Sequence, residues 1–236
     1  MTSWRDIAQL IDHSLLHPTM TDDDIRKGCA VARQAGVKAV CVKPYAIPLA
    51  KECLKGSSVL ICAVVGFPHG NSMTSVKLRE TQEALHAGAA EIDMVVNIGK
   101  VLGGQYDYVR DEIRALARLC HRTSGTLKVI FENDFLQDGH IIELCRICSD
   151  SEVDFVKTST GYGFVKQPDG TYNYRGATEA QVRLMRAHCT QHIRIKAAGG
   201  IRTLDDLLKF KDLGCTRIGA TATESIMEEA QARGIS

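Results

Sequence analysis

The chain has 236 residues, enough for one large domain, and its formal net charge is only +1. Basic residues number 29 and acidic residues 28, so no basic surface is expected that would attract nucleic acid or an anionic membrane. The longest apolar run, near Val59 to Phe67, is far shorter than the ~20 residues of a membrane span. We therefore expect a single domain over residues 1–236 whose partners are small molecules, not nucleic acid or a membrane.

Nine cysteines are scattered along the chain, and no signal-peptide core is found in the first twelve residues. An odd number of dispersed cysteines favours reduced, buried thiols, and hence a cytoplasmic location. Cys145 and Cys148 lie three residues apart within a predicted helix, where this spacing repeats one helix face. We therefore do not expect a redox or metal site at this pair.

Apolar, β-branched segments recur along the chain, each bounded by glycine or polar residues, and they predict eight strands. Amphipathic segments rich in Ala and Leu lie between them and predict eight helices. The predicted strands are Leu10–Leu16, Val37–Lys43, Val59–Gly66, Glu91–Asn97, Leu127–Asn133, Phe155–Thr160, Arg194–Ala198 and Arg217–Thr221. The predicted helices lie near Asp22–Ala35, Ala46–Lys55, Ser75–Ala87, Tyr106–Arg122, Asp138–Ser149, Thr178–His192, Leu204–Leu213 and Glu224–Arg233.

The regular alternation of these elements predicts an α/β protein with a single (β/α)8 TIM barrel. A short N-terminal helix before the first strand is expected to close the base of the barrel. A doubly wound open sheet is the alternative fold, but it usually shows a glycine-rich turn after its first strand. Here that strand ends in Leu15-Leu16 and is followed by His17-Pro18, with no glycine-rich turn, which favours the barrel.

Polar residues interrupt several of the predicted strands, and they are the first candidates for catalysis. In barrels of this type the chemistry lies at the carboxyl ends of the strands. A single buried Asp or Lys is more often a structural ion pair than a catalyst, so the whole set matters more than any member. The interrupting residues are Asp12, His13, Asp93, Glu132, Asn133, Lys157 and Lys196.

Lys157 and Lys196 fall on successive parallel strands, whose backbones lie ~4.8 Å apart, so both side chains can enter one inward cavity. Like charge and burial both favour the neutral amine, which is a nucleophile for carbonyl carbon. The iminium that forms acts as an electron sink, and a carboxylate such as Asp93 can organise the proton transfers. The lysine pair therefore predicts Schiff-base chemistry.

Glycines follow the two lysine strands, at Gly161, Gly199 and Gly200. Barrels often bind phosphate with backbone N–H groups after strands seven and eight, and Arg202 can add a guanidinium to such a site. The simpler alternative is that Gly199 and Gly200 only form a tight turn. Beside Lys196, we favour an anion site.

Motifs spread over nearly the whole chain resemble the deoxyribose-phosphate aldolase family, whose members are class I aldolases on a TIM barrel. The most specific part is the pair Lys157-Thr-Ser-Thr-Gly161 and Lys196-Ala-Ala-Gly-Gly200, in this order. The matching segments are Ile11–Leu16, Ala39–Val42 with Pro44-Tyr45, Val65–Pro68, Glu91–Gly99, Phe155–Gly161 and Lys196–Thr203.

The resemblance implies that Lys157 forms the Schiff base, that Lys196 lowers its affinity for a proton, and that Asp93 works with water in the proton transfers. It implies no metal and no cofactor. The implied reaction, part of nucleoside breakdown, is the reversible cleavage of 2-deoxy-D-ribose 5-phosphate to acetaldehyde and D-glyceraldehyde 3-phosphate. The resemblance also favours a homodimer. The positions that match pocket and phosphate-loop residues of the family are Asp12, Cys41, Thr158, Gly161, Gly199, Gly200 and Arg202.

The strand-eight segment Gly219–Glu224 departs from the phosphate loop of the family. Thr221 can replace a serine hydroxyl, but Thr223 stands where a glycine is usual, and an anion-binding loop can need that backbone freedom. Glu224 adds a negative charge, which weakens the binding of a phosphate dianion unless the side chain points away. The sequence therefore leaves open a second substrate class, an unphosphorylated or different aldehyde acceptor.

Three further departures lie around the expected site. His17 stands where a lysine is usual, and Lys43 where many members have asparagine. The loop of residues 163–176 is longer than the usual ~2 to 6 residues, and it is consistent with a lid, an oligomer contact or a mobile hairpin. Some members end with a tyrosine that assists proton transfer, whereas the last aromatic residue here is Phe210.

Two functions from other classes remain open at this point. A sugar-phosphate isomerase or epimerase would use Asp93 or Glu132 as its base, but it leaves the two lysines without a role. A barrel that only binds a metabolite is compatible with the changed phosphate loop, although the lysines and Asp93 argue against it.

Overall fold

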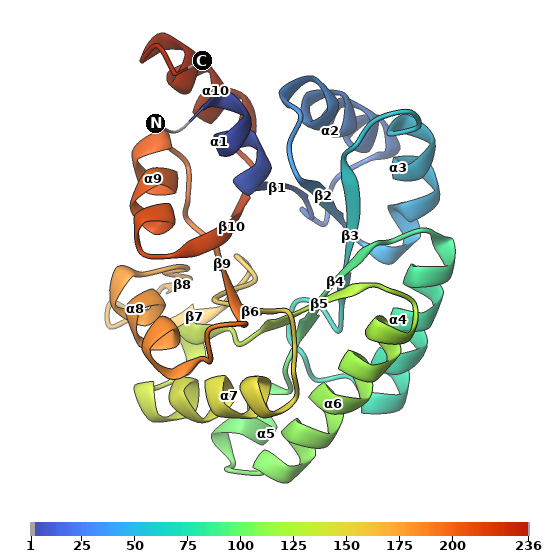
Figure 1. The fold of residues 1–236 in the computed structure, drawn as a ribbon. Coiled ribbons are helices and arrows are strands. Elements are labelled where there is room, and N and C mark those ends of the chain that lie inside the picture. The colour runs from blue at the N-terminus through green and yellow to red at the C-terminus, as the bar shows by residue number, and fades with distance from the viewer. Residues whose placement is uncertain (1–2, 236) are drawn as a thin grey trace.

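A computed structural model describes residues 3–235, which form a closed barrel of parallel strands surrounded by helices (Figure 1). The strand order is β1-β10-β9-β6-β5-β4-β3-β2, and β1 pairs with β10 to complete the ring. This closure confirms the predicted TIM barrel and rules out the open sheet. The barrel strands are β1 (Ile11–Leu15), β2 (Ala39–Val42), β3 (Leu60–Val65), β4 (Glu91–Val95), β5 (Thr126–Ile130), β6 (Phe155–Lys157), β9 (Arg194–Ala198) and β10 (Cys215–Ala220).

The helices begin and end at local sequence signals. Ser3 and Thr21 each cap a helix in a capping box with the Asp three residues later, and Gly36 ends the second of these helices in the left-handed conformation. The helices are α1 (Trp4–Leu10), α2 (Asp22–Ala35), α3 (Ile47–Cys53), α4 (Thr74–Ala87), α5 (Ile98–Leu102), α6 (Tyr106–Arg122), α7 (Asp138–Asp150), α8 (Glu179–His188), α9 (Leu204–Asp212) and α10 (Thr223–Ala232), with short 3-10 turns η1 (Pro44–Ala46) and η2 (Asn133–Phe135).

Most predicted elements agree with the structure to within a few residues, and α5 was not predicted. It is a single short helix of five residues after β4. Asn97 precedes it as the N-cap, and its side chain accepts a hydrogen bond from the N–H of Lys100 at 3.2 Å. Five residues are too few to show a helical period in the sequence.

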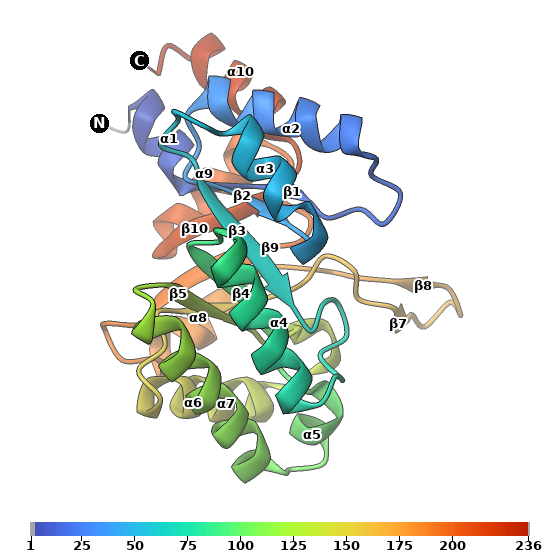
Figure 2. The ribbon, with the colours of Figure 1, turned by 90° about the vertical axis from the view of Figure 1, so that its right-hand side faces the viewer.

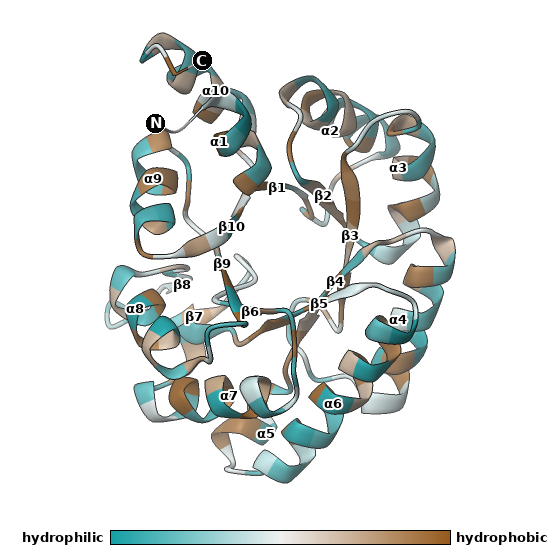
Figure 3. Cartoon of the chain, viewed as in Figure 1, coloured by the Kyte–Doolittle hydropathy of each residue, from teal (hydrophilic) through white to brown (hydrophobic). Residues whose placement is uncertain are grey.

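The main apolar core lies between the outer face of the barrel and the inner faces of the helices. In Figure 3 strand β3 is largely apolar, while the surrounding helices alternate apolar and polar segments, as expected for helices with one face on a barrel. Within residues 3–235, no helix is long and apolar enough to cross a membrane.

The long segment after β6 forms an antiparallel hairpin of β7 (Val165–Lys166) and β8 (Tyr172–Asn173). Figure 2 shows this hairpin extending away from the barrel. Its base is fixed by the carboxylate of Asp134, which accepts hydrogen bonds from the backbone N–H groups of Arg175 and Gly176, both at 2.9 Å. Phe164 and Tyr172 are exposed and stack on each other with ring centroids 4.2 Å apart. The hairpin therefore has a fixed base and a projecting tip.

Candidate active site

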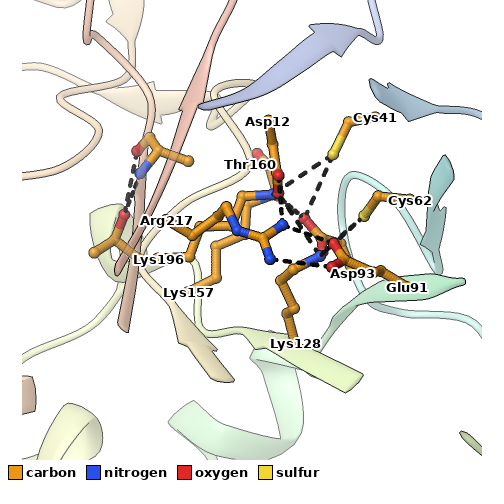
Figure 4. A network of polar contacts seen from close by, with 12 residues as sticks. Asp12, Cys41, Cys62, Glu91, Asp93, Lys128, Lys157, Thr160, Lys196 and Arg217 are labelled. Atoms are coloured by element: carbon orange, nitrogen blue, oxygen red, sulfur yellow. Dashed lines mark hydrogen bonds and ion pairs between the residues drawn. The ribbon is translucent and has the colours of Figure 1, made fainter. Parts of the chain in front are cut away.

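A network of charged and thiol side chains fills the interior of the barrel (Figure 4). Each of the eight barrel strands contributes at least one side chain to it. These side chains point inward from positions that face one another across the ring, so the cluster is a product of the closed barrel. The members, in strand order along the chain, are Asp12, Cys41, Cys62, Glu91, Asp93, Lys128, Lys157, Lys196 and Arg217.

Asp93 lies at the centre of the cluster. Its Oδ2 accepts hydrogen bonds from the Nζ atoms of Lys157 at 2.7 Å and Lys196 at 2.8 Å. Its Oδ1 accepts from Lys128 at 2.8 Å and from the thiol of Cys62 at 3.0 Å. Burial alone would raise the pKa of Asp93, but the three ammonium groups hold it well below its usual range. Asp93 is therefore a carboxylate.

Lys157 and Lys196 are direct partners in the register of β6 and β9. Because both bind the same oxygen of Asp93, a carboxylate lies between the two ammonium groups and reduces the repulsion expected from the sequence. Lys196 is also 2.5 Å from Oδ2 of Asp12. Burial lowers the pKa of Lys196, but Asp12 and Asp93 outweigh this effect and raise it. Its ion pairs with Asp12 and Asp93 therefore stabilise the charged form of Lys196.

Sequence reasoning did not single out Lys128, Glu91 and Arg217, which form the lower part of the cluster. Lys128 lies 2.6 Å from Glu91, and Arg217 lies 2.8 Å from Glu91. Arg217 also donates to Oδ1 of Asp12 at 2.6 Å. Each of these residues stands at or near the start of an otherwise apolar predicted strand. A charged residue in that position is easily interpreted as a strand end that contacts solvent.

A cavity of about 460 Å³ opens above this cluster at the carboxyl ends of the strands. Lys157 is the member of the cluster that lines it. Gly199 and Gly200 line it with φ angles of 87° and 80°, a conformation that favours glycine. The predicted site residues in its wall are Lys157, Gly161, Gly199, Gly200, Arg202 and Thr221.

Three predicted pocket residues lie outside the wall of this cavity. Asp12 and Cys41 are buried below it, within the cluster, and the Sγ of Cys41 is 3.5 Å from Nζ of Lys196. The hydroxyl of Thr158 bridges the backbone of β6 and β9, because it donates to the carbonyl of Ala198 at 3.2 Å and accepts from its N–H at 3.1 Å. Thr158 thus connects the two lysine strands.

The unusual segment Gly219–Glu224 lies at the end of β10 and the start of α10. Its differences from the family phosphate loop affect the cavity less than the sequence implied. Thr223 is the first residue of α10, and its side chain bonds Nδ1 of His13 at 2.8 Å, so no glycine-like backbone is required there. Glu224 is exposed and lines a neighbouring hollow, not the cavity that contains Lys157. His17 and Tyr174, the latter from the base of the hairpin, lie in the cavity wall.

Glu132 occupies an unusual position at the end of β5. Its backbone is left-handed, with φ 59° and ψ 63°, although it is not glycine. Its buried carboxyl group accepts a hydrogen bond from the N–H of Thr160 at 3.2 Å and another from the Thr160 hydroxyl. Burial raises the pKa of Glu132 to about 7. The hydroxyl of Thr160 in turn accepts from the N–H of Tyr162 at 2.9 Å, so Glu132 shapes one wall of the cavity.

Asp12, Cys41, Cys62 and Asp93 place ligand atoms within 4.8 Å of one another, a spacing that could suit a metal ion. Ammonium groups already bind the two carboxylates in this group. A metal ion would have to displace Lys128 and Lys196, so the donor set fits side-chain cations better than a metal.

A closed (β/α)8 barrel with a buried lysine cluster beneath a cavity at its carboxyl face has the architecture of a TIM-barrel enzyme. The chain matches the DeoC/LacD family aldolase model over residues 7–222. Deoxyribose-phosphate aldolase of Rhodopirellula baltica is 42% identical over 97% of this chain and 90% of its own length. The same enzyme of Actinobacillus succinogenes is 44% identical, over 96% of each chain.

Solved structures agree with this assignment. An aldolase structure superimposes with a TM-score of 0.87 at 35% identity and covers 97% of each chain. The tetrameric deoxyribose-phosphate aldolase from Aeropyrum pernix gives a TM-score of 0.84 at 28% identity, over 99% of this chain and 94% of its own. The chain belongs to the DeoC/LacD aldolase family, and the resemblance read from its motifs is confirmed.

Proposed function

We propose that the protein is a class I deoxyribose-phosphate aldolase that cleaves 2-deoxy-D-ribose 5-phosphate reversibly to acetaldehyde and D-glyceraldehyde 3-phosphate. The observation that carries this proposal is the position of Lys157. Among the four cations of the cluster it alone lines the cavity, and Asp93 is its one carboxylate partner among residues 3–235. The names of the relatives support deoxyribose phosphate as the substrate. The position of Lys157 in the cavity wall supports Schiff-base chemistry.

In the cleavage direction, the amine of Lys157 attacks the C1 carbonyl of the sugar, and loss of water gives an iminium ion. The C3 hydroxyl then loses its proton and the C2–C3 bond breaks, which releases glyceraldehyde 3-phosphate and leaves an enamine on Lys157. Protonation of the enamine at C2 and addition of water release acetaldehyde. Asp93, which is held ionised beside Lys157, acts with water in these proton transfers.

The part of the cavity wall formed by glycines and Arg202 suits the phosphate end of the substrate. Gly161, Gly199 and Gly200 expose backbone at this wall, and Arg202 supplies a positive charge. Because Glu224 faces a different hollow, the phosphorylated substrate is favoured over an unphosphorylated acceptor. Arg202→Gln is expected to raise KM for 2-deoxyribose 5-phosphate about tenfold, with little effect on the cleavage of unphosphorylated deoxyribose, as steady-state assays on both sugars would measure. Equal effects on the two sugars would contradict this placement.

Borohydride trapping with acetaldehyde tests the mechanism directly. Reduction should fix an adduct on Lys157, which peptide mass spectrometry would locate. Lys157→Leu should remove both the adduct and turnover while the circular dichroism spectrum stays unchanged, whereas Lys166→Leu, on the exposed hairpin, should keep both. A fully active Lys157→Leu variant would refute the Schiff-base proposal.

The cellular setting is also a proposal. All nine cysteines are free, which supports a reducing compartment such as the cytoplasm. Cleavage of a deoxyribose phosphate suits nucleoside breakdown. A homodimer remains our proposal for the assembly, to be checked by light scattering after size-exclusion chromatography; the A. pernix relative is a tetramer.

A further inference from the structure

The buried cluster contains more positive than negative side chains. Its cations are Lys128, Lys157, Lys196 and Arg217, and its carboxylates are Asp12, Glu91 and Asp93. Inside a barrel, water cannot screen an unpaired charge, so an excess cation is costly. Release of one proton from the cluster would balance the charges.

The contacts indicate which cation can release that proton. Arg217 binds Asp12 and Glu91, and Lys196 binds Asp12 and Asp93. Lys128 binds Glu91 and Asp93. Within the described residues, Lys157 has a single carboxylate partner, Asp93, which it shares with Lys128 and Lys196. Lys157 is therefore the cation that the cluster stabilises least.

We propose that Lys128 is a positioning residue for Lys157. Lys128 binds Oδ1 of Asp93, and with its charge the cations of the cluster outnumber the carboxylates by one. This inference rests on the proposed Schiff base at Lys157. Lys128 is buried, does not line the cavity and has no step in the proposed reaction. Without its charge, the remaining three cations would match the three carboxylates.

Other titratable groups also face Lys157 or its partners. From β2 and β3, the thiols of Cys41 and Cys62 contact Asp93. From the end of β5, Glu132 acts on Lys157 electrostatically, but its carboxyl group is bound by Thr160 and makes no ion pair within the described residues. Within residues 3–235, the titratable groups of the cluster and its neighbourhood are Asp12, Cys41, Cys62, Glu91, Asp93, Lys128, Glu132, Lys196 and Arg217.

The test measures the rate of borohydride trapping with acetaldehyde between pH 5 and pH 10 and takes the pH of half-maximal rate. Lys128→Met should shift this midpoint to higher pH by roughly 2 units, the effect of one charge about 6 Å away at an effective dielectric constant of about 20. Glu91→Gln removes a negative charge and should shift the midpoint in the opposite direction. The double variant Lys128→Met with Glu91→Gln removes one charge of each sign and should return the midpoint towards that of the wild type.

Lys77→Met is the matched control, because Lys77 is equally buried and paired with Glu112 at 2.8 Å, but away from this cluster. It should lower stability without moving the midpoint. Midpoints that stay fixed, or that move in one direction in both single variants, would overturn the role of Lys128. If Lys128→Met does not fold, Glu91→Gln and the double variant decide the question by the same criteria. Absence of any adduct on Lys157 of the wild type would overturn the proposed function as well, which separates the two failures.

Discussion

Glu132 combines a strained backbone with a buried acid, and its ionisation should affect stability. Its pKa rises from an ordinary 4.5 to about 7 in the fold, so the native state binds the proton more tightly than the unfolded chain. Native stability should therefore fall as pH rises from about 5 to 7, by roughly 3 kcal/mol from this group. Glu132→Gln should remove that slope in urea unfolding measured from pH 5 to pH 8.

The chain offers a close control for this measurement. Glu152 also has a positive φ, of 52°, but its side chain is exposed. Glu152→Gln should leave the pH dependence as in the wild type. A Glu132→Gln variant with an unchanged slope would show that the carboxyl group is already ionised at pH 5 in the native protein.

At the scale of elements, the base of the hairpin is the part that matters for the cavity. Asp134 fixes residues 175 and 176, next to Tyr174 in the cavity wall. Asp134→Asn should weaken these backbone hydrogen bonds and raise KM for the sugar phosphate about threefold to tenfold, the range of one charge-assisted hydrogen bond. Asp169→Asn, at the tip where Asp169 bonds Thr171, should leave KM unchanged in the same assay. Equal KM values in both variants would mean that the hairpin does not shape the site.

At the scale of the whole molecule, the cluster makes the barrel sensitive to acid. Burial would raise the pKa of Asp12, but Lys196, Lys128 and Arg217 outweigh it and lower the pKa from 3.8 to about 2. The ionised form is therefore stabilised in the fold, and that stability is lost as pH falls from about 4 to 2, at about 2 kcal/mol for Asp12 alone. Urea midpoints measured at pH 6, 4, 3 and 2.5 should drop steeply over the last steps. A flat profile would contradict the ion pairs described here.

The fold was predicted from the sequence, as were Lys157, Lys196 and Asp93 of the candidate site. Lys128, Glu91 and Arg217 were missed for a physical reason. Lys157, Lys196 and Asp93 each interrupt an apolar strand, so their charges stand out. Glu91 and Arg217 stood at the first position of their predicted strands, where a charge usually contacts solvent. Only the register of the closed barrel shows that they point inward.

Other parts of the sequence reading were limited by length and by geometry. Strands β7 and β8 have two residues each, too few to show an alternating pattern. The positive φ of Glu132 follows from tertiary contacts and leaves no local sequence signal. The single-domain prediction extends to residues 1, 2 and 236, which lie outside the described residues, and it stays a prediction.

The distribution of the cluster over all eight barrel strands has a consequence for folding. Asp12 and Arg217 touch at 2.6 Å although 205 positions separate them in the chain, so this contact exists only once the first and last strands have paired. A half-barrel would lack part of the charge balance around Lys157. Adduct formation at Lys157 can therefore report on refolding. A stopped-flow experiment that follows the adduct would measure the time at which the first and last strands pair, separately from the earlier formation of helices.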